Sequence, residues 1–288
     1  MPGVTRRTVM VLGYISAPTE SLNINPGVDF KVYMDMQMQL LATDPAYFGL
    51  GGVQQYLAAY SDEENIRWAG RLFRHYCIEG NRDPATNDPY ALPHIRNPDF
   101  ADGTEGWDLA PAEADSIVAG AVPGYGAFQC RYPAPPAIAI GDTFLKTTRR
   151  SAKPNVFSQQ IRGLEPGRLY SLKMITGDYQ DLVGEIQDRE LHGVSIGIDD
   201  VDLLTDTKDT FQFIFGNHPS HRFGKFHHLG NYGGNYTYWM NYHWSVFRAN
   251  ASTARLTVSD WKGEDDPGGD IEQELIYNFI EVQPYSRQ

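Results

Sequence analysis

The first 80 residues alternate between apolar runs and helical periodicity. Thr8 to Ser16, TVMVLGYIS, is almost continuously apolar and rich in β-branched side chains, which is typical of a strand buried on both faces. Residues 30–43 place apolar side chains three and four positions apart, directly after Asp29, a favourable N-cap residue. This spacing predicts a helix that ends before Pro45.

A second strand and a second helix are predicted next. The apolar segment Ala46 to Leu50 favours a strand, and the glycines that follow it allow a sharp turn into a loop. Ser61 and Glu64 have the spacing of a capping box, and apolar residues then recur at helical spacing as far as Gly80, a favourable C-terminal glycine. The N-terminal part therefore contains two consecutive βα units.

Beyond about residue 97 the pattern changes to short strands separated by turns. Phe211, Phe213 and Phe215 alternate with polar positions, as in a half-buried antiparallel strand. The predicted strands are 116–121, 127–132, 143–148, 156–161, 169–176, 193–198, 210–215, 238–248, 254–259 and 275–282. Residues 81–96 contain three prolines and are interpreted as a stiff linker. We therefore expect an α/β segment over 1–80, the linker 81–96 and a β-sandwich over 97–288.

Three segments of the second part carry a family resemblance. They are NPDFADGTEGW at 97–107, VFSQQ at 156–160 and LEPGRLY at 164–170. In this order they resemble carbohydrate-binding modules with the galactose-binding-like jelly-roll fold, over roughly residues 90–288. The resemblance implies an all-β jelly-roll sandwich that binds or positions a glycan.

The two βα units are too few for an independent parallel sheet, because buried parallel strands need neighbours on both edges. Residues 1–80 resemble the last two βα units of a (β/α)8 (TIM) barrel of the glycoside-hydrolase kind. That resemblance implies a catalytic carboxylate near the end of the first strand, and Glu20 is the nearest one. The partner acid would lie on the missing remainder of the barrel, so the catalytic barrel is expected to be largely absent from these residues.

Charge excludes some classes of partner. The 288 residues include 36 acidic and 24 basic residues, a formal net charge of −12, which disfavours nucleic acid and anionic membrane surfaces. No apolar run approaches the roughly 20 residues of a membrane span. The cellular location is left open, and a secreted or periplasmic one depends on a signal peptide in an upstream part.

Aromatic and amide side chains are the candidates for glycan contacts, because flat rings stack on sugar C–H faces while amides bond hydroxyl groups. They are Tyr236, Trp239, Trp244, Gln54 and Tyr56. The alternative for Tyr56 is packing against the helix that follows it, and the alternative for Trp239 and Trp244 is the core of the sandwich. Trp239 and Trp244 are an odd number of positions apart, so a regular strand would place at most one of them in the core.

Two metal sites are considered. The jelly-roll resemblance implies a structural calcium ion, for which Asp99, Asp102 and Glu281 supply oxygen ligands. The imidazoles of His218, His221, His227 and His228 suit zinc, but no helix fixes their spacing and no cysteine accompanies them. The alternative for each set is an ordinary surface turn, and no cofactor is assigned.

Three functional hypotheses remain. The first is the C-terminal portion of a glycoside-hydrolase-like protein whose sandwich binds glycan, which leaves open whether this chain catalyses anything. The second is a non-catalytic carbohydrate-binding module whose N-terminal part is a docking surface. The third is a structural sandwich that only braces the α/β segment.

Overall fold

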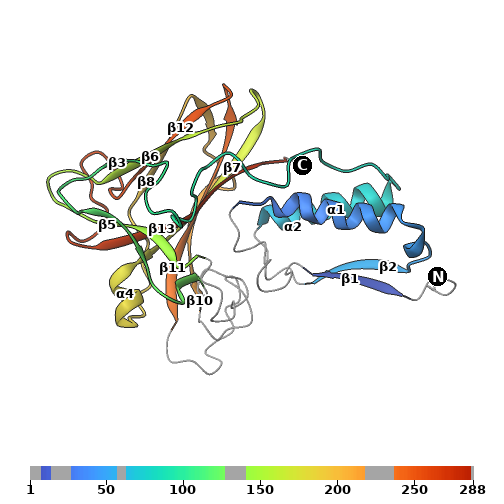
Figure 1. Cartoon of the computed structure of the whole chain (residues 1–288), viewed down its shortest axis with the longest axis horizontal. Coiled ribbons are helices and arrows are strands. Elements are labelled where there is room, and N and C mark those ends of the chain that lie inside the picture. The colour runs from blue at the N-terminus through green and yellow to red at the C-terminus, as the bar shows by residue number, and fades with distance from the viewer. Residues whose placement is uncertain (1–7, 14–26, 57–62, 127–140, 218–236, 287–288) are drawn as a thin grey trace.

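A computed structural model describes residues 8–13, 27–56, 63–126, 141–217 and 237–286 of the chain. These residues form a small α/β layer and a two-sheet β-sandwich, which lie side by side in Figure 1. The elements of the α/β layer are β1 (Val9–Gly13), α1 (Phe30–Thr43), β2 (Gly52–Tyr56) and α2 (Glu63–Leu72), which a π-helical turn at Phe73–Ile78 extends. The sandwich elements are β3 (Asp108–Ala110), β4 (Ile117–Ala121), β5 (Thr143–Thr148), β6 (Val156–Ile161), β7 (Leu169–Asp178), α4 (Tyr179–Gly184), β8 (Ser195–Asp199), β9 (Val201–Leu204), β10 (Thr210–Asn217), β11 (Tyr238–Ala249), β12 (Ala254–Ser259) and β13 (Glu274–Pro284).

The α/β layer confirms two βα units but moves the second strand. β1 and β2 pair in parallel, and α1 begins after Asp29, whose carboxylate accepts the Lys31 N–H at 2.8 Å. The predicted strand at Ala46–Leu50 is wrong, because Pro45–Tyr47 is a 3₁₀ turn. The Asp44 carboxylate accepts the Ala46 N–H at 2.8 Å and favours this turn directly after the helix. The strand lies beyond the glycines instead.

The sandwich consists of two antiparallel sheets. One sheet has the order β10-β11-β7-β13-β5-β4, with β9 also pairing with β11, and the other has the order β3-β6-β12-β8. The core between them contains Phe157, Ile161, Leu172, Phe247 and Leu256, all at most 2% exposed. The predicted sandwich is therefore confirmed among the described residues, although the strand predicted at 127–132 lies outside them.

The other face of the seven-stranded sheet is aromatic. Phe211, Phe213 and Phe215 lie on this one face, as predicted, and pack with Tyr242 and Trp244. Trp244 is stacked on Phe211, with their ring centroids 5.4 Å apart. This sheet therefore has apolar side chains on both faces.

A β-bulge interrupts β13. Its pairing with β7 shifts register between Asn278 and Glu281, and Phe279 has a φ of 50°, in the left-handed region that is unusual for a bulky residue. Tyr277 faces the core between the sheets before the bulge, whereas Ile280 and Val282 face it afterwards. One extra residue thus exchanges the odd and even faces of the strand.

The segment 97–107 places two aromatic side chains in the core of the sandwich without forming a strand. A series of turns runs from Asn97 to Gly106, and β3 follows Trp107. Phe100 and Trp107 are buried and pack together, with ring centroids 5.3 Å apart. The Asn97 side chain donates to the carbonyls of Gly103 and Glu105. These backbone acceptors are therefore hydrogen-bonded within the turn and do not need a neighbouring strand.

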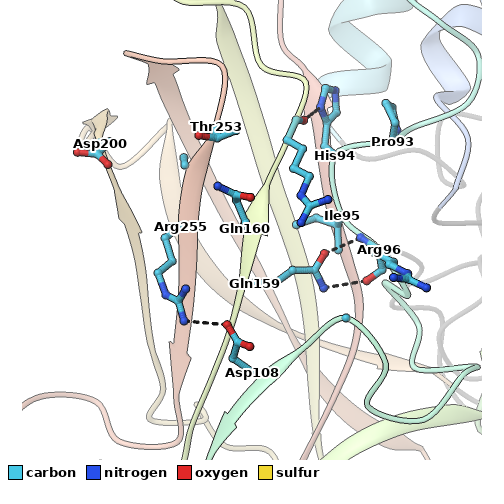
Figure 2. A pocket seen from close by; sticks show the side chains of 13 residues that line it. Pro93, His94, Ile95, Arg96, Asp108, Gln159, Gln160, Asp200, Thr253 and Arg255 are labelled. Carbon is cyan, nitrogen blue, oxygen red and sulfur yellow. Dashed lines mark hydrogen bonds and ion pairs between the residues drawn. The ribbon is translucent and has the colours of Figure 1, made fainter.

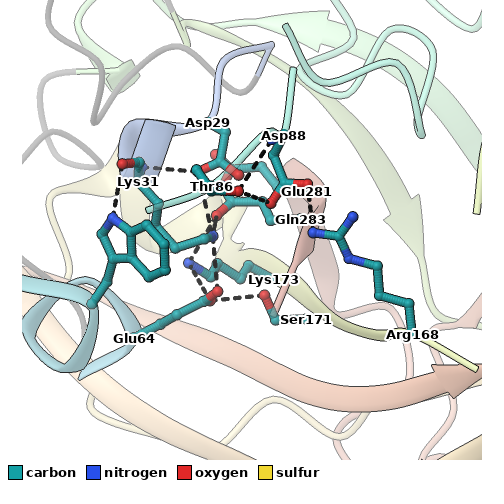
Figure 3. A network of polar contacts seen from close by, with 11 residues as sticks. Asp29, Lys31, Glu64, Thr86, Asp88, Arg168, Ser171, Lys173, Glu281 and Gln283 are labelled. Atoms are coloured by element: carbon teal, nitrogen blue, oxygen red, sulfur yellow. Dashed lines mark hydrogen bonds and ion pairs between the residues drawn. The ribbon is translucent and has the colours of Figure 1, made fainter. Parts of the chain in front are cut away.

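A buried ionic network joins α1 and α2 to the seven-stranded sheet (Figure 3). The Glu64 carboxylate lies 2.8 Å from Lys31 Nζ and 3.0 Å from Lys173 Nζ, and it accepts a hydrogen bond from the Ser171 hydroxyl at 2.8 Å. Lys31 Nζ also donates to Gln283 Oε1 at 2.8 Å. Lys31 comes from α1, Glu64 from α2 and the others from β7 and β13, so these contacts fix the α/β layer against the sandwich.

The segment 81–96 also joins the two parts. The Asp29 N–H donates to the Tyr90 carbonyl at 2.8 Å, and Val28 forms an isolated bridge with Ala91. His94 and Ile95 are buried. The segment is therefore held along its length, while its division from the flanking domains stays a prediction.

Candidate functional site

A cleft of about 800 Å³ opens on the outer face of the four-stranded sheet (Figure 2). Its lining residues come from the segment before β3, from β3 and β6, from the β8–β9 turn and from β12. They are Pro93, His94, Ile95, Arg96, Gly106, Asp108, Gln159, Gln160, Arg162, Asp200, Thr253, Ala254 and Arg255. The cleft therefore combines residues distant in sequence.

Strand register places the polar floor of the cleft. Gln160 lies opposite Arg255 in the β6–β12 pair, and Ser158 lies opposite Asp108 in the β6–β3 pair, so these side chains share the outer face. The Arg255 guanidinium donates to the Ser158 hydroxyl at 2.6 Å and to the Asp108 carboxylate at 3.0 Å. The floor therefore presents amide, carboxylate and guanidinium groups.

Gln159 fixes one wall of the cleft. Its amide accepts the Arg96 N–H at 2.6 Å and donates to the Arg96 carbonyl at 2.9 Å, as Figure 2 shows. The side chain is only 6% exposed, so both of these bonds are sheltered from water. Gln159 thereby holds the segment before β3 against β6. Its side-chain amide forms the two hydrogen bonds with the Arg96 backbone that a paired strand would otherwise supply.

His94 forms the deep part of the same wall. Its Nδ1 lies 2.7 Å from the Arg162 carbonyl, which cannot donate, so Nδ1 carries the proton and Nε2 is an acceptor. Nε2 is buried and has no hydrogen-bond partner among the described residues. Burial lowers the pKa of His94, so the imidazole is neutral at pH 7.

Three arginines supply the positive charge of the cleft. Arg96 pairs with Glu105 and Arg255 pairs with Asp108, in both cases with side chains at least half exposed. Arg162 is exposed and forms no ion pair within the described residues. Because exposed ion pairs are weak, all three guanidinium groups can turn to a ligand.

The two tryptophan candidates have different surroundings. Trp244 is 4% exposed, between Phe211, Tyr285 and Lys173, so its proposed role as an exposed sugar platform is wrong. It faces the α/β layer, a burial that the strand pattern could not indicate. Trp239 is half-buried, and the Arg189 guanidinium lies 5.1 Å from its ring centroid. Trp239 is therefore the remaining aromatic candidate.

The other expected site residues are not brought together with the cleft. Gln54 is exposed on β2, where a loop was expected, and Tyr56 belongs to the same strand, although its side chain is not described. Glu20, Tyr236 and the four histidines proposed for zinc lie outside the described residues.

The proposed calcium ligands do not form a site. Asp99 and Asp102 lie in the turns before β3, whereas the Glu281 carboxylate accepts a hydrogen bond from Gln283 at 2.9 Å and belongs to the network of Figure 3. Over the residues that the structure describes, no three His, Cys, Asp or Glu side chains gather as metal ligands would. The bulge in β13 explains why the Glu281 side chain points away from the sandwich core.

Among the described residues, no helix has the length and apolar character of a membrane span.

One feature of the sequence does indicate the cleft. Ser158, Gln159 and Gln160 form a continuous polar run inside a strand whose ends are apolar. Such a run breaks the alternation of a strand that only covers a core. The arginines gave no local signal, because they come from three separate segments.

No protein-family model and no curated protein sequence matches the chain. Among solved structures, it is similar to TmCBM61 in complex with β-1,4-galactotriose, at 13% identity and a TM-score of 0.32, over 66% of this chain and 97% of that chain. It is also similar to the CBM22-1–GH10 modules of Clostridium thermocellum endo-1,4-β-D-xylanase 10B complexed with xylohexaose, at 10% identity and a TM-score of 0.30, over 64% of this chain and 27% of that chain.

A third similar structure is the enzymatically active domain of tailspike protein 4 from bacteriophage CBA120, at 12% identity and a TM-score of 0.36. The match covers 66% of this chain and 21% of the tailspike chain. The structural neighbours thus include carbohydrate-binding modules, and the resemblance of residues 1–80 to a TIM barrel is not shown by these matches. Because the TM-scores are low, the β-sandwich assignment rests on the strand pairing, and any functional argument rests on the cleft.

Proposed function

We propose that the β-sandwich is a carbohydrate-binding module whose ligand lies in the cleft over β6 and β12. The observation that carries the proposal is a cleft of about 800 Å³ whose polar floor is fixed in place by strand pairing. Binding pockets for small ligands have volumes of roughly 300–1,000 Å³. Sugar hydroxyls require paired donors and acceptors, which the Gln160 amide, the Asp108 carboxylate and the Thr253 hydroxyl supply.

The preformed wall supports binding rather than catalysis. Gln159 and His94 hold the cleft through contacts that need no ligand, so little ordering cost remains when a saccharide enters. The cleft contains two carboxylates, Asp108 and Asp200, of which Asp108 is occupied by Arg255. Their arrangement gives no reason to propose glycoside hydrolysis at this site.

The test is a binding screen of the full chain against immobilised oligosaccharides, followed by calorimetry with any saccharide retained. We expect Gln160→Ala and Thr253→Ala to weaken binding by about tenfold each, the effect of losing one to two net hydrogen bonds. Trp239→Ala is the control, because its side chain is half-buried and does not line the cleft. Retention of no saccharide would contradict the proposal, and loss of binding only in Trp239→Ala would move the site to that ring.

A second role is proposed for the α/β layer, because the β1–β2 pair is a two-stranded parallel sheet. Val9 and Val11 on β1 are 52% and 53% exposed. We propose that this pair is part of a larger parallel sheet, as in the last two βα units of a glycoside-hydrolase-like barrel. Hydrogen exchange of the chain tests this: the amides of β1 and β2 should exchange far faster than those of β7, and equal protection would contradict it.

A further inference from the structure

The charged residues of the cleft differ from those of the chain as a whole. The chain carries 36 acidic and 24 basic residues, whereas the charged residues that line the cleft are three arginines and two aspartates. The arginines come from three elements: Arg96 precedes β3, Arg162 follows β6 and Arg255 lies on β12. An acidic protein therefore concentrates guanidinium groups around one opening.

The same cleft offers no aromatic platform. None of the described residues that line it is Phe, Tyr or Trp. A neutral sugar would have to bind through hydroxyl groups alone, without ring stacking on its C–H faces. The chain has aromatic side chains in abundance, but the described ones nearest in the fold, such as Tyr170 and Phe157, are buried in the core.

Arg162 is the guanidinium that is best placed to receive an anion. The backbone around it is fixed, because its carbonyl accepts from His94 Nδ1 at 2.7 Å and its N–H donates to the His94 carbonyl at 3.2 Å. Its side chain is exposed and forms no ion pair within the described residues, so no carboxylate there has to be displaced. A guanidinium of this kind presents a planar fork that matches a carboxylate or a sulfate.

The other two arginines are oriented by weak partners. Gly106 has a φ of 84°, and a Cβ at this position would lie 3.2 Å from Arg96 Cδ, so the glycine leaves room for the Arg96 stem along the cleft. Arg255 is held over the sheet by Ser158 and Asp108. Both arginines can keep these orientations while adding a contact to a second anionic group along a chain of sugars.

We infer that the cleft selects an anionic saccharide, one that carries carboxylate or sulfate groups on successive sugars, with Arg162 as its principal anion contact. The inference rests on the proposed function, because it names the ligand class of the same cleft. The positive charge involved is permanent, since guanidinium groups stay protonated and the neighbouring His94 is neutral at pH 7. The ligand should therefore bind equally well from about pH 6 to 8.

The experiment uses matched saccharides with the full chain. Calorimetry compares an oligogalacturonide with its fully methyl-esterified form, which has the same backbone without charge. It also compares a sulfated galactan oligosaccharide with its desulfated form. We expect one charged probe to bind at least tenfold more tightly than its neutral partner, and this preference to shrink when NaCl rises from 50 to 500 mM, as screening requires. The pair that shows the preference identifies carboxylate or sulfate as the group bound.

The variant Arg162→Gln keeps a hydrogen-bonding side chain and removes the charge at an exposed position. It should lower the affinity for the charged probe about tenfold more than it lowers the affinity for the neutral partner. Arg74→Gln makes the same charge change on the exposed surface of the π-helical turn, away from the cleft, and should have no effect. Equal binding of charged and neutral forms, or no effect of Arg162→Gln, would overturn the anionic selectivity and leave the module a binder of glycans. Binding of no saccharide at all would overturn the proposed function as well.

Discussion

Thr176 has a single hydroxyl group that two buried histidines share. Its Oγ1 lies 2.8 Å from His192 Nδ1 and 2.8 Å from His243 Nε2. One hydroxyl has one proton to donate, so one imidazole accepts from Thr176 and the other donates to it. Because the contacts are made by Nδ1 of His192 and Nε2 of His243, the two rings then have the same tautomer, both Nδ1–H or both Nε2–H.

Thr176→Val removes this shared partner while conserving side-chain shape. We expect a loss of about 1–3 kcal/mol in the free energy of unfolding for each buried ring nitrogen left unpaired. Urea denaturation at pH 7 measures it. Thr257→Val on β12 is the matched control, at a half-exposed position, and should change stability by less than about 0.5 kcal/mol. Equal effects of the two variants would contradict this account of Thr176.

His192 and His243 also make stability dependent on acid. Burial lowers the pKa of each to about 3, below the value near 6.5 in an unfolded chain. Between these values the unfolded state binds more protons, so the contribution of the two histidines is complete above pH 6.5 and is lost as pH falls toward 3.

The corresponding test compares the wild type with His243→Gln from pH 7 to pH 4. Buried carboxyls such as Asp181, whose pKa burial raises to about 7, act in the opposite sense, so the difference between the two proteins isolates the histidine. We expect the wild type to lose up to about 1.4 kcal/mol per pH unit more than the variant below pH 6. Parallel curves of the free energy of unfolding against pH would show that the pKa of His243 does not differ between the folded and unfolded states.

At the scale of elements, Glu64 on α2 neutralises two lysines from different parts of the fold. Lys31, Glu64 and Lys173 have side chains at most 5% exposed. Although burial lowers it, the Asp29 and Glu64 carboxylates raise the pKa of Lys31 above its usual value, so the lysine stays charged. Asp29 also pairs with Lys31, at 3.4 Å, but removing Glu64 would take away the carboxylate that the two buried ammonium groups share.

Glu64→Gln should therefore destabilise the chain by about 3–5 kcal/mol, the cost of breaking a buried ion pair on one side. Its neighbour provides the control. Glu63 pairs with Arg67 at the surface and is 54% exposed, so Glu63→Gln should cost less than about 1 kcal/mol. Thermal unfolding of both variants measures the difference, and a similar cost for both would contradict a structural role for the network.

Local sequence signals predicted the elements that obey a simple period. α1 and the strands β5, β6 and β12 have the expected bounds because capping and alternation agree there. The strand prediction failed at Pro45–Tyr47, because the Asp44 carboxylate caps a 3₁₀ turn there. Asp200 lies in a turn that joins β8 and β9, two strands that the sequence pattern did not separate.

The site was less predictable than the fold, because its residues are related only through tertiary pairing. Arg96 and Gln159 are 63 positions apart in sequence, and Arg255 approaches Asp108 across 147 positions. Aromatic richness pointed instead to Trp244, which the α/β layer and Tyr285 cover. Composition indicates that such residues exist, but only the sheet register decides which of them share a surface.

At the scale of the whole molecule, the buried network and the segment 81–96 tie the two parts into one unit. Differential scanning calorimetry of the chain should show one unfolding transition in the described fold, because the α/β layer shares its polar core with β7 and β13. Deleting residues 1–92 should lower the midpoint and make Trp244 accessible to acrylamide. An unchanged midpoint and an unquenched Trp244 would show that the sandwich is independent.

The bulge in β13 gives this coupling an unexpected basis. The residues that follow it, Glu281 and Gln283, reach the α/β layer only because one additional position exchanges the two faces of the strand. A regular strand of the same sequence, without the bulge, would keep every polar side chain of the interface and yet direct Gln283 into the sandwich and Val282 toward Lys31. Attachment of the two parts thus depends on the local backbone geometry of β13 as well as on the identity of its side chains.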